Sequence, residues 1–129
     1  MKKTGIINAE LDYQLAQLGH TDRIVVCDAG LPIPPGPEVV DLAFRFGVPS
    51  FEVVLLGLLD ELVIEGATAA GEVVEQNPAV HELLISRLPG LDFVPHEELK
   101  RLSSTARLVV RTGEATPYAN VVLRCGVPF

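Results

Sequence analysis

The chain has 129 residues, of which 48% are hydrophobic and 21% charged, and its net charge at pH 7 is −7. This length suits one domain with one core, and ten dispersed basic residues in an acidic chain argue against binding to a phosphate backbone. No apolar run reaches the roughly 20 residues of a membrane span, so we expect neither nucleic acid nor a membrane as a partner.

The amino-terminal stretch MKKTGIINAE lacks the apolar segment of about 7 to 15 residues that a secretory signal carries. Cys27 and Cys125 lie far apart, each within an apolar run. This is typical of small buried thiols in a reducing compartment rather than of a disulfide framework. We therefore expect a cytoplasmic protein.

The apolar, charge-poor composition predicts more apolar surface than one small domain can bury, which favours a homo-oligomer. The final residues, VVLRCGVPF, end in Phe129 without a polar tail. We expect Phe129 to be buried at or beside a subunit contact, near the turn at residues 118–120.

The first predicted element is a helix that begins after Asn8, a good N-cap residue. Its apolar residues recur on one face, at Leu11, Leu15 and Leu18. Gly19 fits the position just past the end of this helix, so His20 is expected to follow a helix carboxyl end.

Residues 23–27, RIVVC, are β-branched and almost continuously apolar, which predicts a strand covered on both faces. The proline-rich residues 28–37 can continue neither a strand ladder nor a helix, so they are expected to form a shaped loop. Residues 38–46 are interpreted as a second helix, stopped by Gly47 and Pro49.

Residues 50–61 have helical spacing, and residues 62–68 after them have the composition of a strand. The Asn-Pro pair at 77–78 predicts the start of another helix, which ends before Pro89. A short helix is expected over residues 95–102.

The strands expected over residues 107–113 and 120–125 close the chain on either side of a turn-like segment. Strands that alternate with helices favour an α/β fold in layers. Together with the length, this pattern predicts a single domain spanning residues 1–129.

His20 and Asp28 flank the first strand and are candidate functional residues. The exposed carbonyls of a helix end suit an imidazole that carries and delivers a proton, although His20 could simply bond those carbonyls. Asp28 ends a buried strand, and ligands of open α/β sheets gather beyond the carboxyl ends of strands. Alternatively, Asp28 forms an Asx-turn into the next loop.

Further candidates lie in the second half of the chain. His96 stands at a helix start, where it is either functional or an ordinary surface residue, and His81 is interpreted as a solvent-facing residue of its helix. Tyr118 and Asn120 flank Ala119 in a turn that can present a phenol and an amide to a hydroxyl-rich ligand, although a packed turn is equally consistent with these residues.

Several other kinds of site are not indicated. The chain has no Walker-type phosphate loop and no GxSxG, HExxH or CxxC motif. A metal site built from His20, Cys27, Asp28 and His96 would match no standard ligand spacing. The GEVVEQ and GEATP segments are interpreted as structural, and no cofactor is expected.

Six segments carry a resemblance to a known family. They are, in order, INAEL, LGHTDRIVVCDAGLPIP, GVPSF, HEELKRL, VVRTGEATPYAN and VVLRCGVPF. Together they resemble the D-ribose pyranase family, within the wider group that includes L-fucose mutarotases. The similarity runs from Lys3 to Phe129 and is weakest between about residues 53 and 94.

The resemblance implies a three-layer α/β/α domain with a mostly parallel or mixed central sheet. It also implies rings of five or ten subunits, that is, a homopentamer or homodecamer with the sugar site near a subunit boundary. The implied activity is a cofactor-free, cytoplasmic interconversion of the pyranose and furanose forms of free D-ribose before phosphorylation. An L-fucose-type mutarotase, or a non-catalytic sugar-binding accessory of ribose uptake, is the alternative.

Carried over by position, the resemblance makes His20 the acid/base residue and makes Asp28, His96 and the Tyr118-Ala119-Asn120 segment the sugar-binding groups. One imidazole that gains and loses a proton near neutral pH can open a hemiacetal ring and close it again, so no metal is required. Whether Asp28 orients His20 or binds sugar hydroxyls stays open.

Overall fold

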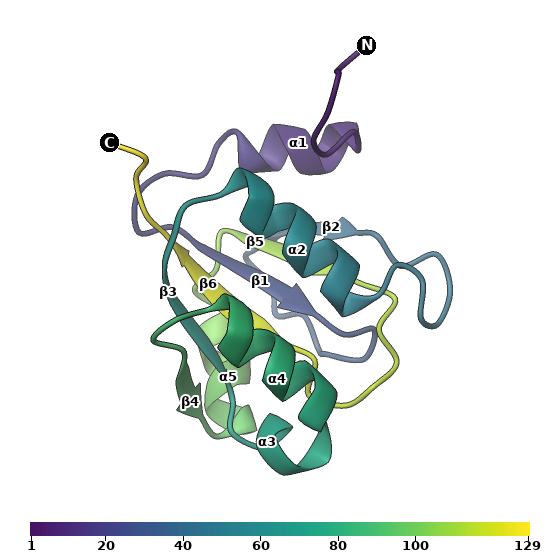
Figure 1. Cartoon of the computed structure of the whole chain (residues 1–129), viewed down its shortest axis with the longest axis vertical. Helices are drawn as coiled ribbons and strands as arrows, with labels where there is room; N and C mark the ends of the chain where they lie inside the picture. The colour runs from purple at the N-terminus through teal and green to yellow at the C-terminus, as the bar shows by residue number, and fades with distance from the viewer.

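The computed structural model describes all 129 residues and has a six-stranded mixed sheet at its centre, with helices on both faces (Figure 1). The strands are β1 (Arg23–Cys27), β2 (Glu38–Asp41), β3 (Ile64–Ala70), β4 (Asp92–Val94), β5 (Leu108–Arg111) and β6 (Val121–Cys125). The helices are α1 (Ala9–Leu15), α2 (Phe51–Glu61), α3 (Val73–Gln76), α4 (Pro78–Arg87) and α5 (His96–Ser103).

The direction of the strands gives the sheet two chemically different ends. The strand order is β2-β5-β1-β6-β3-β4, and β6 is antiparallel to both of its neighbours while every other neighbouring pair is parallel. All strands except β6 therefore finish at one end, where β6 begins. We call this the carboxyl end of the sheet, and the opposite one the amino end.

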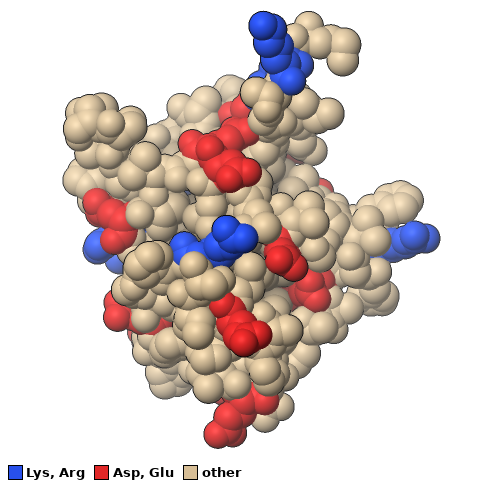
Figure 2. Space-filling model, in the orientation of Figure 1, with Lys and Arg blue, Asp and Glu red and all other residues tan.

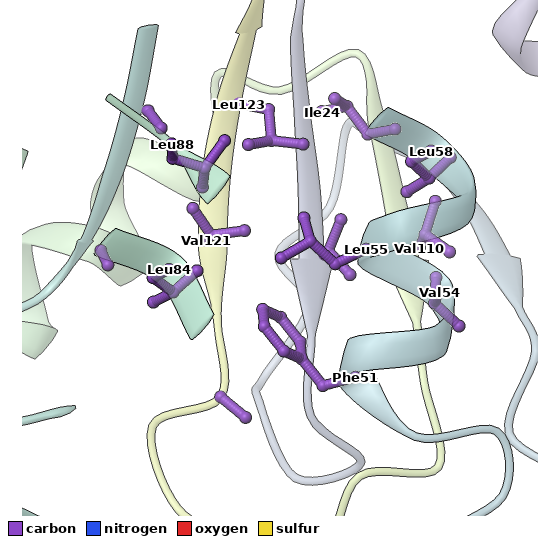
Figure 3. Close-up of a cluster of buried hydrophobic side chains, with 14 of the residues drawn as sticks. Ile24, Phe51, Val54, Leu55, Leu58, Leu84, Leu88, Val110, Val121 and Leu123 are labelled. Atoms are coloured by element: carbon purple, nitrogen blue, oxygen red, sulfur yellow. The ribbon is translucent and has the colours of Figure 1, made fainter. Parts of the chain in front are cut away.

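The core lies on both faces of the sheet, because alternate side chains of each strand point to opposite sides. Ile24 and Val26 of β1 belong to the larger apolar cluster beneath α1, α2 and α4, whereas Val25 and Cys27 belong to a smaller cluster with Leu99 of α5. Figure 3 shows how side chains from α2 and α4 meet the sheet in the larger cluster. The expected three-layer α/β arrangement with a mixed sheet is confirmed.

Several predicted elements are also confirmed. Residues 23–27 form β1, buried on both faces, and the long segment after Ser50 does divide into a helix followed by a strand. Asn77 caps α4 by accepting a hydrogen bond from the Val80 N–H at 3.4 Å. The last two predicted strands are β5 and β6.

The helix predicted over residues 38–46 is wrong. Its first part is β2, whose Val40 is buried opposite Val110 of the parallel neighbour β5, and the rest is a loop. The Arg111 guanidinium on β5 also binds the Asp41 carboxylate, at 2.9 Å. Pairing with a strand far along the chain therefore overrides the local helical spacing.

The first helix ends earlier than predicted, at Leu15, and Leu18 contacts the core from the following turn. Gly19 is therefore not its cap residue. The Gly19 N–H donates to the Asp22 carboxylate at 2.8 Å, so residues 19–22 form a separate turn that carries His20.

The surface agrees with the acidic composition. On the face shown in Figure 2, Lys and Arg side chains lie apart among acidic ones, and no extended basic patch forms there. None of the helices has the length and the apolar composition that crossing a membrane requires.

Candidate functional site

A pocket of about 430 Å³ lies at the carboxyl end of the sheet. It is lined by residues 28–32 after β1, Phe46 of the β2–α2 loop, His96 after β4, residues 114–118 after β5, and Asn120 before β6. These segments are distant in sequence, and they converge because their strands end or begin at the same end of the sheet. This is where ligands of α/β sheets generally bind.

Asp28 and Asn120 form a reciprocal pair in this pocket. The Asp28 N–H donates to Asn120 Oδ1 at 2.9 Å, and Asn120 Nδ2 donates to Asp28 Oδ2 at 3.1 Å. Asp28 Oδ1 also accepts from the Gly30 N–H at 2.9 Å, so the Asx-turn considered from the sequence is present as well. With Asn120 only 1% exposed, the Asp28 carboxylate is held in a fixed orientation in the pocket wall.

Tyr118 and His96 form another part of the wall. Their rings meet edge to face, with centroids 5.1 Å apart. Two hydrogen bonds of 3.0 and 3.1 Å from the His96 N–H to the Glu72 carboxylate fix the start of α5. His96 Nδ1 is buried without a hydrogen-bond partner in the chain, which is rare for a polar atom and is often associated with a functional position.

Backbone strain also marks the pocket. Tyr118 has φ of +58°, a left-handed conformation that costs of order 1–3 kcal/mol for a residue other than glycine. Ala119 after it is fully buried in the core and does not line the pocket. The strained turn thus directs Tyr118 into the pocket while Ala119 anchors the segment.

Two further residues hold the pocket loop, and neither was singled out as functional from the sequence. Asn77 Nδ2 donates to Thr116 Oγ1 and to the Pro117 carbonyl, both at 2.8 Å, so the cap of α4 also anchors this loop. Glu114 Oε2 accepts from the Phe51 N–H at 3.0 Å, and Glu114 Oε1 accepts from the Thr116 hydroxyl at 2.9 Å. Only their positions in the sequence could have pointed to them, because Asn77 directly precedes a predicted helix and Glu114 follows a predicted strand.

His20 lies elsewhere. Its Nε2 is 3.1 Å from Glu65 Oε2 at the amino end of the sheet, whereas Asp28 lies beyond β1 at the carboxyl end. At about 3.3 Å per residue, β1 alone puts more than about 13 Å between them. Within one chain, therefore, Asp28 does not orient His20, and His20 does not reach the pocket.

Phe129 also lies at the amino end, because β6 runs away from the turn at residues 118–120 (Figure 1). The expectation that it lies near this turn is wrong within one chain, where the Phe129 side chain is fully exposed. The carboxyl terminus and His20 thus share one end of the sheet, and the pocket occupies the other.

The remaining candidate residues lie outside the pocket. His81 is half-buried, with its ring tilted against that of Phe93 at 5.8 Å between centroids. Burial, assisted by the neighbouring Asp28 charge, raises the pKa of the Cys27 thiol to about 12. This thiol therefore stays protonated at neutral pH. No three His, Cys, Asp or Glu side chains are grouped as metal ligands.

A wider groove of about 830 Å³ lies between the amino end of α2 and the length of α4, and it shares Glu114 and Thr116 with the pocket. Neither histidine nor tyrosine lines it. The smaller pocket combines a carboxylate, an amide, a phenol and an imidazole in one concavity, and we take it as the candidate binding site.

The family whose sequence model matches this chain, over residues 1–128, is the RbsD / FucU transport protein family. This chain belongs to that family. The resemblance found in the sequence motifs is therefore confirmed.

Among RbsD/FucU relatives, D-ribose pyranase 1 of Rubrobacter xylanophilus is 68% identical over 129 residues, which cover all of both chains. The structure of Bacillus subtilis RbsD complexed with D-ribose is similar over all of both chains, with a TM-score of 0.96 and 43% identity. The fucose mutarotase of Streptococcus pneumoniae in complex with L-fucose also covers all of both chains, with a TM-score of 0.81. At 21% identity, that last similarity supports the fold alone.

Proposed function

We propose that this protein is a D-ribose pyranase, a cofactor-independent isomerase that interconverts the β-pyranose and β-furanose forms of free D-ribose. The observation that carries the proposal is a pocket that combines a carboxylate, an amide, a phenol and an imidazole, in a chain that is 68% identical, end to end, to a protein named D-ribose pyranase 1. Residues 1–129 form one domain. The protein acts in the cytoplasm, on the free sugar before it is phosphorylated.

The reaction needs only proton transfers. Opening the pyranose removes the proton of the anomeric hydroxyl, breaks the bond from C1 to the ring oxygen and protonates that oxygen. Closing the furanose reverses these steps with the hydroxyl on C4 as the attacking group. A positioned imidazole can act as the acid in one half and as the base in the other.

Asp28, Asn120, Tyr118 and His96 are the proposed sugar-binding groups, and the buried Ala119 holds the turn that presents two of them. The carboxylate and the amide accept and donate hydrogen bonds at fixed positions because each is held by the other. These groups would retain the open aldehyde while it rotates between the two ring sizes.

The proposed acid/base residue, His20, comes from a neighbouring copy of the chain. It lies at the amino end of the sheet, too far from the pocket of its own chain, so a complete site requires a second copy whose amino end approaches the pocket. The same approach would bring Phe129 of that copy toward the turn at residues 118–120. Rings of five or ten subunits would repeat this contact around a closed assembly.

Exposed apolar side chains support such a contact. Phe46 lines the mouth of the pocket and is 83% exposed, and Phe129 at the other end of the sheet is fully exposed. Contact between the two ends of neighbouring copies would remove these large apolar side chains from water, which favours the contact.

Exchange spectroscopy by NMR on free D-ribose tests the function. The expected result is exchange between pyranose and furanose anomeric signals that is much faster with the protein than without it. His81→Ala, which alters a histidine outside the pocket, should exchange like the wild type. Ribose binding without faster exchange would instead indicate a sugar-binding accessory, and faster exchange of L-fucose alone would indicate a fucose-type mutarotase.

A further inference from the structure

The amino end of the sheet carries a side-chain cluster in which one carboxylate has two different partners. Glu65 Oε2 lies 3.1 Å from His20 Nε2, and Glu65 Oε1 lies 3.2 Å from Arg124 Nε. The three side chains come from a turn, from β3 and from β6. Glu65 is therefore held from one side and faces the imidazole with its other oxygen.

An irregularity in the sheet puts Glu65 in this position. Ile64 of β3 pairs with Cys125 of β6, and Gly66 pairs with the adjacent Arg124, so Glu65 is an extra residue between two consecutive pairs. Such bulges re-aim a side chain and are frequent beside active sites.

Gly66 makes room for the ion pair between Arg124 and Glu65. A Cβ at residue 66 would approach the Arg124 guanidinium to 3.2–3.4 Å, which is closer than ordinary contact. The missing side chain thus leaves room for Arg124 to lie across β3 and reach Glu65.

The backbone of His20 is fixed independently of Glu65. Gly19 N–H donates to the Asp22 carboxylate at 2.8 Å, and Thr21 N–H donates to the Cys125 carbonyl at 2.9 Å. Thr21 has φ of +69°, which is uncommon for a residue other than glycine. With the turn fixed, the main remaining freedom of His20 is the orientation of its half-exposed ring, and Glu65 is the group that contacts this ring.

We propose that Glu65 is a positioning residue, which holds Nε2 of His20 so that Nδ1 is the nitrogen that exchanges protons with the sugar. A carboxylate only accepts hydrogen bonds, so the nitrogen facing it carries the proton in the neutral ring, and the other nitrogen keeps its lone pair. The carboxylate of a catalytic triad selects an imidazole tautomer in the same way. This inference rests on the proposed function, because it deepens the role given to His20.

The test combines a spectroscopic and a kinetic measurement on the intact protein. In ¹⁵N-histidine NMR spectra near pH 8, the His20 signals, identified by their loss in His20→Ala, should show the Nε2-protonated tautomer. Glu65→Ala should give a mixture of tautomers and lower kcat for ribose exchange by about 10- to 100-fold, the size of loss that follows when the carboxylate partner of a metal-bound histidine is removed. KM should change little, because Glu65 does not line the pocket.

Two further variants separate this role from a purely structural one. Glu65→Gln keeps an acceptor for Nε2, so it should retain the tautomer and part of the activity. Arg124→Ala breaks the same cross-strand ion pair but leaves the carboxylate beside His20, so its loss of kcat should be smaller than that of Glu65→Ala. Thermal melts establish that each variant is folded.

The possible failures are distinguishable. If His20→Ala loses exchange while Glu65→Ala keeps the wild-type kcat and tautomer, the positioning role is refuted and the proposed function stands. Equal losses in Glu65→Ala and Arg124→Ala with an unchanged tautomer would also refute it, because the ion pair alone would explain them. If the wild type does not accelerate ribose exchange, or if folded His20→Ala exchanges at the wild-type rate, the proposed function fails and this inference fails with it.

Discussion

The two ends of the sheet carry different parts of the proposed chemistry. At the carboxyl end, segments after four strands form a concave pocket in which Asp28 and Asn120 are held by reciprocal hydrogen bonds. At the amino end, His20 stands half-exposed on a turn and contacts Glu65 and Arg124 of the sheet rim. In the proposed mechanism the first end binds the sugar and the second presents the proton donor, so a complete site would take one end from each of two copies.

Backbone strain occurs at both ends. Thr21 and Tyr118 are the two non-glycine residues with positive φ, and they adjoin His20 and the pocket respectively. Strained conformations persist where the surrounding structure imposes them, and they cluster at functional sites. Each end is therefore preorganised, although the candidate binding pocket lies only at the carboxyl end.

Replacing the proton-transfer group should have the largest effect. His20→Ala should slow catalysed pyranose–furanose exchange by about 10²- to 10⁴-fold, the usual contribution of a general acid/base. Ribose should still bind, because the proposed sugar-binding groups of the pocket are all retained in this variant. NMR exchange and ribose titration measure the two effects, and an unchanged exchange rate in the folded variant would remove His20 from the mechanism.

Loosening the pocket loop should have a smaller effect on activity. Asn77→Ala removes a helix cap and both hydrogen bonds to the loop, so it should lower the unfolding free energy by about 1–2 kcal/mol and raise KM severalfold. Asn8→Ala is a matched control, because Asn8 caps α1 far from the pocket. It should lower stability by about 1 kcal/mol and leave KM unchanged. Equal KM values in the two variants would argue against a binding role for the loop.

Asp22 provides a prediction on pH and stability. The hydrogen bond from the Gly19 N–H lowers the pKa of Asp22, with Arg107 assisting and partial burial opposing. Because the folded pKa is below the unfolded one, the ionised carboxylate stabilises the fold above about pH 4, and this contribution is lost as the pH falls further.

Asp22→Asn should therefore lower Tm by a few degrees at pH 7, and the difference from the wild type should shrink below about pH 4. Thermal melts across this pH range measure it. A difference that stays constant down to the acid limit would mean that the Asp22 charge does not stabilise the turn that carries His20.

Metal removal should have no effect. Exhaustive chelation should leave the exchange rate unchanged, because ring opening needs proton transfer only and no group of ligand side chains is arranged for a metal. Activity lost on chelation and regained with Zn²⁺ would contradict this.

The sequence predicted much of the pocket. Strand ends and the turn at residues 118–120 located Asp28, Tyr118 and Asn120, because the carboxyl ends of strands meet in space. Glu72 and Glu114 also follow strands, but neither stands beside a nucleophile, so the sequence alone indicates only a structural role for them.

Other features could not be predicted, or were predicted wrongly. Residues 38–46 have a spacing that suits a helix, and only pairing with β5 makes the first four of them a strand. The bulge at Glu65 depends on the register between β3 and β6, which local sequence does not determine. The separation of His20 from Asp28, by contrast, follows from the predicted strand between them, since an extended segment of five residues keeps its two ends apart.

Subunit complementation tests the central claim most directly. His20→Ala and Asp28→Asn chains, each inactive alone, are mixed, dissociated and reassembled in equal amounts, and mixed assemblies are isolated with two different tags. If sites combine His20 of one copy with the pocket of another, about a quarter of the sites regain both intact parts, and exchange activity returns to about that fraction of the wild type. If each chain forms its whole site alone, no mixed assembly contains an intact site, and the absence of recovered activity would contradict this account.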